Sequence, residues 1–118
     1  MRLVIGLLAT LATPALADFA PITDGDVFNQ TMGDKRLRIG ALGLTLRVFP
    51  EGRIEGIALG RDVTGEWTWQ DGYFCRDMMW GDRPIDYNCQ LVELDGSRIR
   101  FTSDQGQGMS AVFQLRSE

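Results

Sequence analysis

Turn signals recur about every ten residues from residue 43 to the end of the chain, and this spacing limits the fold more than any other feature. Between the turns, apolar and polar residues alternate, as Leu44, Leu46 and Val48 do in the first segment. Short period-two segments joined by Gly-rich turns predict an antiparallel meander. The turns are Pro50-Glu51-Gly52, Asp71-Gly72, Gly81-Asp82-Arg83-Pro84, Asp95-Gly96 and the loop over residues 104–108.

The segments between these turns predict a mainly β fold. About seven strands are expected in an antiparallel meander that curls into a small barrel or sandwich. One short helix precedes them: Thr23 and Asp26 are placed as in a capping box, and Gly33 is a stop signal. We expect this helix to cover an open end or an edge of the sheet. Its apolar face consists of Val27, Phe28 and Met32.

The first 17 residues have the features of a secretory signal peptide. Arg2 precedes an apolar run over residues 3–12, and Pro14-Ala15-Leu16-Ala17 follows. This run is shorter than the roughly 20 residues that span a bilayer, so no membrane anchor is expected. We predict cleavage after Ala17 and a periplasmic or secreted protein. Residues 18–22 then form an N-terminal linker, and residues 23–118 form a single β-rich domain.

The charge of the mature chain excludes some classes of partner. Removal of residues 1–17 leaves 101 residues with 11 basic and 16 acidic side chains, a net charge of −5. Lys35 is the one lysine, and the arginines are scattered along the chain. Nucleic acids and anionic membrane surfaces are bound by clustered Lys and Arg, so neither partner is expected.

Cys75 and Cys89 are the two cysteines of the chain, and an oxidising compartment favours their pairing. If a hairpin folds about Asp82, antiparallel pairing places Cys75 directly opposite Cys89, where a disulfide can form. A redox-active pair is the alternative, but catalytic dithiols have C-x-x-C spacing, whereas 13 residues separate these two cysteines. We therefore predict a structural disulfide.

The same register divides the hairpin into two faces. The opposite face carries Phe74, Arg76, Met78 and Trp80, more apolar surface than a solvated face needs. Two explanations stay open: a neighbouring segment such as the helix covers these four residues, or they form an exposed binding patch with Arg76 as its charged member. The cysteine face is the predicted core, with Cys75, Met79, Ile85, Tyr87, Cys89 and Leu91, joined by Trp67, Trp69, Ile99, Phe101, Phe113 and Leu115.

Little in the sequence indicates catalysis. The chain has no His, the usual general base and commonest metal ligand. Asp71, Asp77, Asp82 and Asp86 lie close in sequence, but most fall at or beside turns, where Asp is favoured for backbone reasons. Neither a calcium-loop pattern nor a glycine-rich phosphate loop is present. We predict no catalytic residue, no metal and no cofactor, and an enzyme is the least expected class.

Several segments resemble a group of short exported proteins of Gram-negative bacteria, over nearly the whole mature chain. They are EGRIEGIALG, TGEWTWQDGYFCR, WGDRPIDYNCQ and RFTSDQGQG. The resemblance implies the domain boundaries and the cysteine pair, but no reaction. Some members of the group are labelled dihydrodipicolinate reductase, whose family has a glycine-rich nucleotide loop and a His-His-x-x-Lys region. This chain has no His, so its residues do not support that activity.

A looser resemblance is to small exported barrel inhibitors of bacterial metalloproteases. It implies that Asp18-Phe19-Ala20-Pro21-Ile22 inserts into a protease cleft, whereas an unstructured terminus is the simpler interpretation. The sequence thus predicts a binding or interaction module of the cell envelope, whose partner is an envelope protein or a small apolar ligand. A protease inhibitor acting through its N-terminal segment is the alternative. The oligomeric state is not predicted.

Overall fold

The computed structural model describes Gly6 and residues 18–117; the predicted signal peptide otherwise lies outside the described residues. Residues 18–117 contain nine strands, the helix α1 and two short helical segments, η1 and α2. In chain order the elements are β1 (Ala20–Ile22), α1 (Gly25–Met32), β2 (Arg36–Ile39), η1 (Gly40–Leu42), β3 (Leu44–Val48), β4 (Arg53–Ala58), β5 (Arg61–Gln70), β6 (Tyr73–Trp80), β7 (Arg83–Asp95), β8 (Arg98–Thr102), α2 (Ser103–Gly106) and β9 (Ser110–Arg116).

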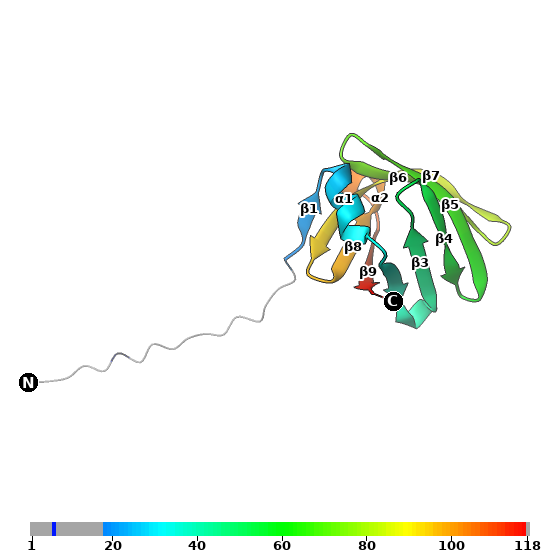
Figure 1. Ribbon diagram of the computed structural model, residues 1–118, viewed down its shortest axis with the longest axis horizontal. Helices are drawn as coiled ribbons and strands as arrows, with labels where there is room; N and C mark the ends of the chain where they lie inside the picture. The colour runs from blue at the N-terminus through cyan, green and yellow to red at the C-terminus, as the bar shows by residue number, and fades with distance from the viewer. Residues whose placement is uncertain (1–5, 7–17, 118) are drawn as a thin grey trace, which may run out of the picture.

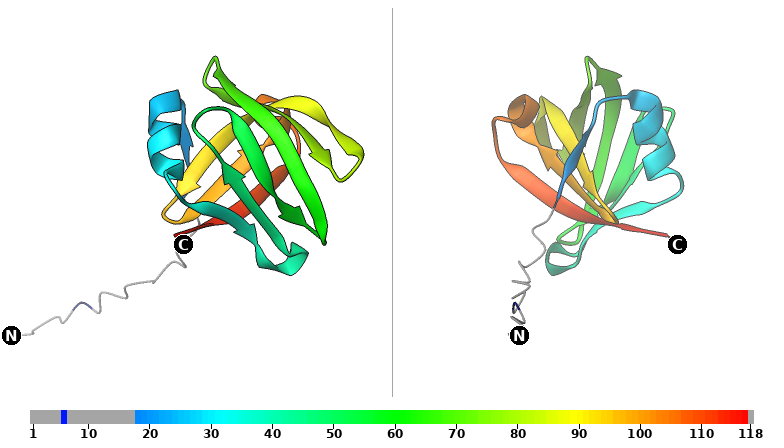
Figure 2. Two further views of the ribbon diagram at one scale, coloured as in Figure 1. Left: turned by 45° about the vertical axis from the view of Figure 1, so that its right-hand side comes forward. Right: turned by 90° about the vertical axis from the view of Figure 1, so that its left-hand side faces the viewer.

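Eight of the strands close into an antiparallel barrel (Figures 1 and 2). The ring runs β7-β6-β5-β4-β3-β2-β9-β8, and β8 pairs back onto β7. β1 is an extra strand that pairs with β7 from outside the ring. The predicted mainly β, antiparallel fold is confirmed, and its closed form is a barrel. None of the helices within the described residues is long and apolar enough to cross a membrane.

Two-residue turns join four of the pairs of consecutive strands. Leu59-Gly60 and Asp71-Gly72 have positive φ at both positions, as the type I′ hairpin turn requires. Gly81 and Gly96 have positive φ at the first position of their turns. These turns match the right-handed twist of the strands, which explains why the Gly and Asp spacing predicts the meander.

Two glycines inside strands allow neighbouring backbones to approach closely. A Cβ atom on Gly56 of β4 would lie 2.1 Å from the Thr45 carbonyl oxygen of β3. A Cβ atom on Gly65 of β5 would lie 2.4 Å from the Asp77 carbonyl oxygen of β6. No side chain fits at either position, so these glycines permit the strong curvature that a small barrel needs.

Helix α1 packs on the barrel beside β1 (Figure 2). It inserts one aromatic ring into the core. Phe28 is fully buried, and its ring centre lies 5.0–6.5 Å from four rings of β5, β6 and β8. The helix begins one residue later than expected: Asp24, not Thr23, caps it by accepting hydrogen bonds from the amides of Asp26 and Val27. The four rings are Trp67, Trp69, Phe74 and Phe101.

The disulfide between Cys75 and Cys89 is confirmed, but the predicted core face of the hairpin is wrong. The turn has two residues instead of three, so Trp80 pairs with Arg83. A β-bulge in β7 then adds one residue and restores the predicted Cys75–Cys89 pairing. Because of the extra residue, even-numbered residues of β7 face inward on one side of the bulge and odd-numbered residues face inward on the other. The cysteines lie on the outer side of the barrel wall.

The exposure of the hairpin side chains follows from this exchange: the face predicted to be the core is the outer face. Tyr87 is 56% exposed and Met79 is 37% exposed, although both were expected in the core. Cys75 is still only 1% exposed, although it lies on the outer side of the wall. The predicted core residues of the other strands are buried or half-buried as expected: Trp67, Trp69, Ile99, Phe101, Phe113 and Leu115.

Candidate functional site

The four residues predicted as a binding patch point into the barrel instead of out to solvent. Phe74 is 4% exposed and Arg76 is 8% exposed, whereas Met78 and Trp80 are half-buried and pack against the core. Phe74 is in contact with Phe28 of α1, so the helix covers part of this face, as the first of the two explanations expected. An exposed patch is therefore not formed; a role of these residues in binding stays a prediction.

Three of these residues line a cavity of about 190 Å³ inside the barrel. Seven of the eight ring strands, all except β5, contribute to its wall, so closure of the barrel creates it. Nine of the eleven lining residues are apolar, and Arg76 and Gln90 are the two polar ones. The apolar members are Leu37, Leu46, Val48, Ile54, Phe74, Met78, Phe101, Ala111 and Phe113.

Arg76 is the charged group of the cavity. Its Nη1 donates a hydrogen bond to the main-chain carbonyl of Asp86, in the bulge of β7. Burial lowers the pKa of Arg76, an effect that the nearby carboxylates of Asp77 and Asp86 oppose. A guanidinium nevertheless stays protonated at physiological pH. The cavity therefore contains one fixed positive charge in an apolar surrounding.

The guanidinium of Arg76 has unused hydrogen-bonding capacity. It forms no ion pair with a carboxylate of residues 18–117, and within this range its Nε and Nη2 have no hydrogen-bond partner. No fully enclosed side-chain nitrogen or oxygen of the described residues lacks a partner. It follows that Nε and Nη2 reach space that water or a ligand can enter.

Gln90 and the segment α2 lie next to each other at the cavity wall. Gln90 Nε2 donates to Ser103 Oγ at 3.4 Å. Asn88 and Asp104 exchange two hydrogen bonds, from Asn88 Nδ2 to Asp104 Oδ1 at 2.8 Å and from the Asp104 amide to Asn88 Oδ1 at 2.9 Å. These bonds fix α2 against β7 beside the half-buried Gln90.

Trp80 has a structural environment and does not line the cavity. Its indole Nε1 donates to the carbonyl of Ala58 at 2.8 Å, and the guanidinium of Arg61 lies 4.8 Å from its ring centre. These contacts connect the tip of the β6–β7 hairpin to the β4–β5 hairpin. Trp80 belongs to the predicted patch, but it is not one of the residues that line the cavity.

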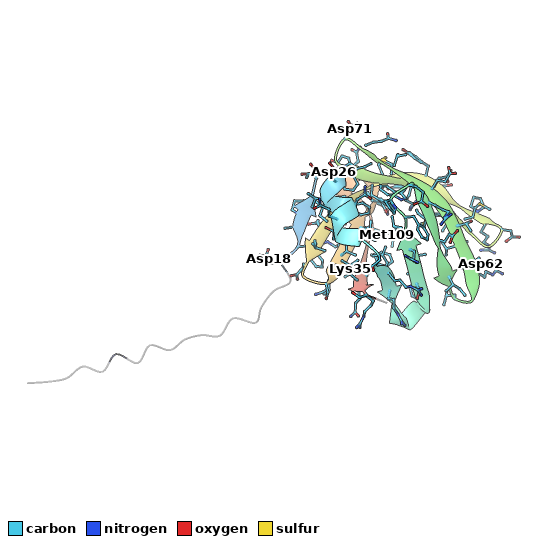
Figure 3. All side chains as sticks on the ribbon, viewed as in Figure 1. Asp18, Asp26, Lys35, Asp62, Asp71 and Met109 are labelled. Carbon is cyan, nitrogen blue, oxygen red and sulfur yellow. A yellow bond between two sulfur atoms is a disulfide. The ribbon has the colours of Figure 1, made fainter. Side chains whose placement is uncertain are left out.

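The carboxylates of the chain do not gather into a catalytic or metal-binding cluster in the part that the structure describes. No group of three His, Cys, Asp or Glu side chains within it is placed to hold a metal ion. Figure 3 shows Asp62 on the opposite side of the molecule from Asp26 and Asp71. Asp71 lies in a hairpin turn with positive φ, in agreement with the backbone role expected of it.

The N-terminal segment 18–22 is more ordered than the linker that was expected. Ala20–Ile22 forms β1 on β7, and Ile22 is 5% exposed. Phe19 lies below two guanidinium groups, with its ring centre 5.2 Å from Arg98 and 4.2 Å from Arg100. A protease inhibitor that inserts this segment would first have to detach it from the barrel.

Sequence reasoning missed most of the cavity. Leu37 alternates with charged residues in Arg36–Ile39, a period-two signal that indicates strand β2. The hairpin register places Gln90 opposite Phe74, on the same face as Arg76, whereas Ala111 carries no local signal, because only barrel closure brings β9 to this cavity. Comparisons of the chain with family models, curated proteins and solved structures found no match. The resemblances noted from the sequence therefore stay predictions.

Proposed function

We propose that the mature chain acts in the periplasm or the medium as a non-catalytic binding protein, and that it binds a small apolar ligand inside the barrel. The cavity carries this proposal: nine apolar side chains and two polar ones line a volume of about 190 Å³. Apolar walls with a few polar groups are the usual composition of a small-molecule site. The predicted signal peptide and the disulfide favour an exported protein.

The size of the cavity limits the ligand. Pockets for drug-sized molecules have roughly 300–1,000 Å³, and a cavity of about 150 Å³ holds one benzene molecule. At about 190 Å³, this cavity fits one ring with a small substituent or a short alkyl chain. A longer alkyl chain would have to extend beyond this volume.

The methyl groups of methionine provide a direct test. Met78 lines the cavity, Met79 is its neighbour on the outer face, and Met109 is 86% exposed (Figure 3). Benzyl alcohol or hexanol added to protein with ¹³C-labelled methionine methyl groups should shift the Met78 signal in a saturable way. The Met79 and Met109 signals should stay in place.

A blocked cavity supplies the matched control. Ala111 lines the cavity on β9, and Ala111→Trp adds a large side chain there without removing strand hydrogen bonds. Ala41→Trp adds the same side chain at an exposed position of η1 outside the cavity. Binding should be lost in the first variant and retained in the second. If no small apolar probe shifts Met78 in the wild-type protein, the proposed function is wrong.

A further inference from the structure

The charge of the cavity identifies the chemical class of ligand more closely than its apolar wall does. We infer that the site is built for an apolar monocarboxylate, with the carboxylate on Arg76 and a ring or short alkyl chain against the apolar wall. This inference rests on the proposed function, because it names the ligand of the same cavity. It predicts a preference that a purely apolar site does not have.

The burial of Arg76 is the first argument. A charged side chain that is 8% exposed has lost most of its hydration, and a buried charge requires hydrogen bonds and an opposite charge. Its one hydrogen bond within residues 18–117 goes to the neutral Asp86 carbonyl, and no carboxylate there forms an ion pair with it. The carboxylates of Asp77 and Asp86 lie nearby without forming an ion pair, so an anion in the cavity would supply the direct partner that is missing.

The shape of the guanidinium is the second argument. Nη1 is occupied by the Asp86 carbonyl, whereas Nε and Nη2 have no partner in the described part of the chain and are not fully enclosed. Nε–H and one N–H of Nη2 are parallel donors, the pair that binds both oxygens of a carboxylate. The free edge of Arg76 is thus a carboxylate-binding edge.

The remainder of the wall limits the ligand to one charge. Arg76 is the only cationic side chain among the eleven lining residues, and nine of the others are apolar. A second negative charge would be desolvated there without a partner. Gln90, the other polar residue, can donate or accept one more hydrogen bond.

Two probes of similar size separate the inference from the proposed function. Benzoate and benzyl alcohol differ mainly in charge, and their affinities are measured from the Met78 methyl shift with isothermal titration as a second readout. Benzoate should bind about tenfold to a hundredfold more tightly, as a charge-assisted hydrogen-bond pair in a buried site implies. Equal affinities would overturn the inference and leave the proposed function standing; failure of both probes would overturn both.

Substitutions of Arg76 test whether this residue is the origin of the preference. Arg76→Met has a similar length and no charge, so it should abolish the preference for benzoate while benzyl alcohol still binds. Arg83→Met removes one positive charge from an exposed position of β7 and should leave the preference intact. Benzoate binding that survives Arg76→Met unchanged would refute the assignment. Should Arg76→Met fail to fold, Arg76→Lys decides: the point charge keeps part of the preference and loses the bidentate pair.

Discussion

The ring of Phe28 joins helix α1 to the barrel core, and its removal tests how α1 is bound. Phe28→Ala deletes a fully buried side chain that contacts four aromatic rings from three strands. The helix itself should tolerate the change, because Ala has a higher helix propensity than Phe. Any loss of stability therefore reports on the packing between α1 and the barrel.

The expected cost is large. Truncation of a buried Phe to Ala costs about 3–5 kcal/mol, and the cost is highest where the surroundings cannot collapse into the space. The four contacting rings stand on hydrogen-bonded strands of a closed barrel, so little collapse is expected. We expect a loss of about 4 kcal/mol, a large part of the roughly 5–15 kcal/mol by which a domain is stable.

Urea unfolding followed by tryptophan fluorescence measures this loss with the disulfide intact. With a slope of about 1–3 kcal/mol/M, a loss of about 4 kcal/mol lowers the midpoint by about 1–4 M. Val27→Ala is the matched control, because Val27 lies in the same helix and is 47% exposed. It should change the free energy of unfolding by less than about 0.5 kcal/mol.

One result would refute the reasoning. A loss below about 1.5 kcal/mol for Phe28→Ala, at an unchanged urea slope, would show that α1 does not complete the core. The substitution should also weaken benzyl alcohol binding, because Phe74 and Phe101 contact Phe28 on one side and line the cavity on the other.

Further predictions concern the disulfide, a strand glycine, the N-terminal strand and pH. Replacing both Cys75 and Cys89 by Ala opens a loop with a sequence separation of 14, and thermal or urea unfolding should show a loss of about 3 kcal/mol. Gly65→Ala places a Cβ atom 2.4 Å from the Asp77 carbonyl oxygen, so it should cost about 2 kcal/mol or more in the same assay. Deletion of residues 18–22 removes the buried Ile22 and should lower the unfolding midpoint; an unchanged midpoint would contradict the packing of β1. Benzoate affinity, followed by titration, should fall as pH drops through the ligand's own pKa of roughly 4, because the neutral acid loses its attraction to Arg76, and it should be flat at neutral pH, where the guanidinium stays charged.

The turns and the strand periodicity could be predicted from the sequence, because both depend on residues that are close together in the chain. Asp71-Gly72 is a type I′ turn in the structure, and Leu46 and Val48 alternate inward as their spacing indicates. β2 escaped prediction because its alternation of Leu37 with Arg36 and Arg38 covers only four residues. Local signals thus predict the hairpins but not the strand that closes the ring.

The sequence did not reveal which face of β6 lies inside the barrel, because two assumptions both favoured the cysteine face. A disulfide was expected in the core and an arginine at the surface, and both expectations follow average burial preferences. In the barrel, Cys75 is buried on the outer side of the wall and Arg76 on the inner side. Alternation along a strand defines two faces, but it does not show which one lies inside.

The bulge in β7 connects the fold to the candidate site. It adds one residue opposite Asp77, so the ladder pairs Arg76 with Asn88 on one side of the bulge and Met78 with Ile85 on the other. An extra residue in a bulge is released from regular pairing, and the Asp86 carbonyl in this bulge accepts the hydrogen bond of Arg76 Nη1. This bond fixes Nη1 against the wall, whereas Nε and Nη2 stay partly accessible without a ligand present. The irregularity that aligns the cysteines therefore also orients the one cation of the cavity.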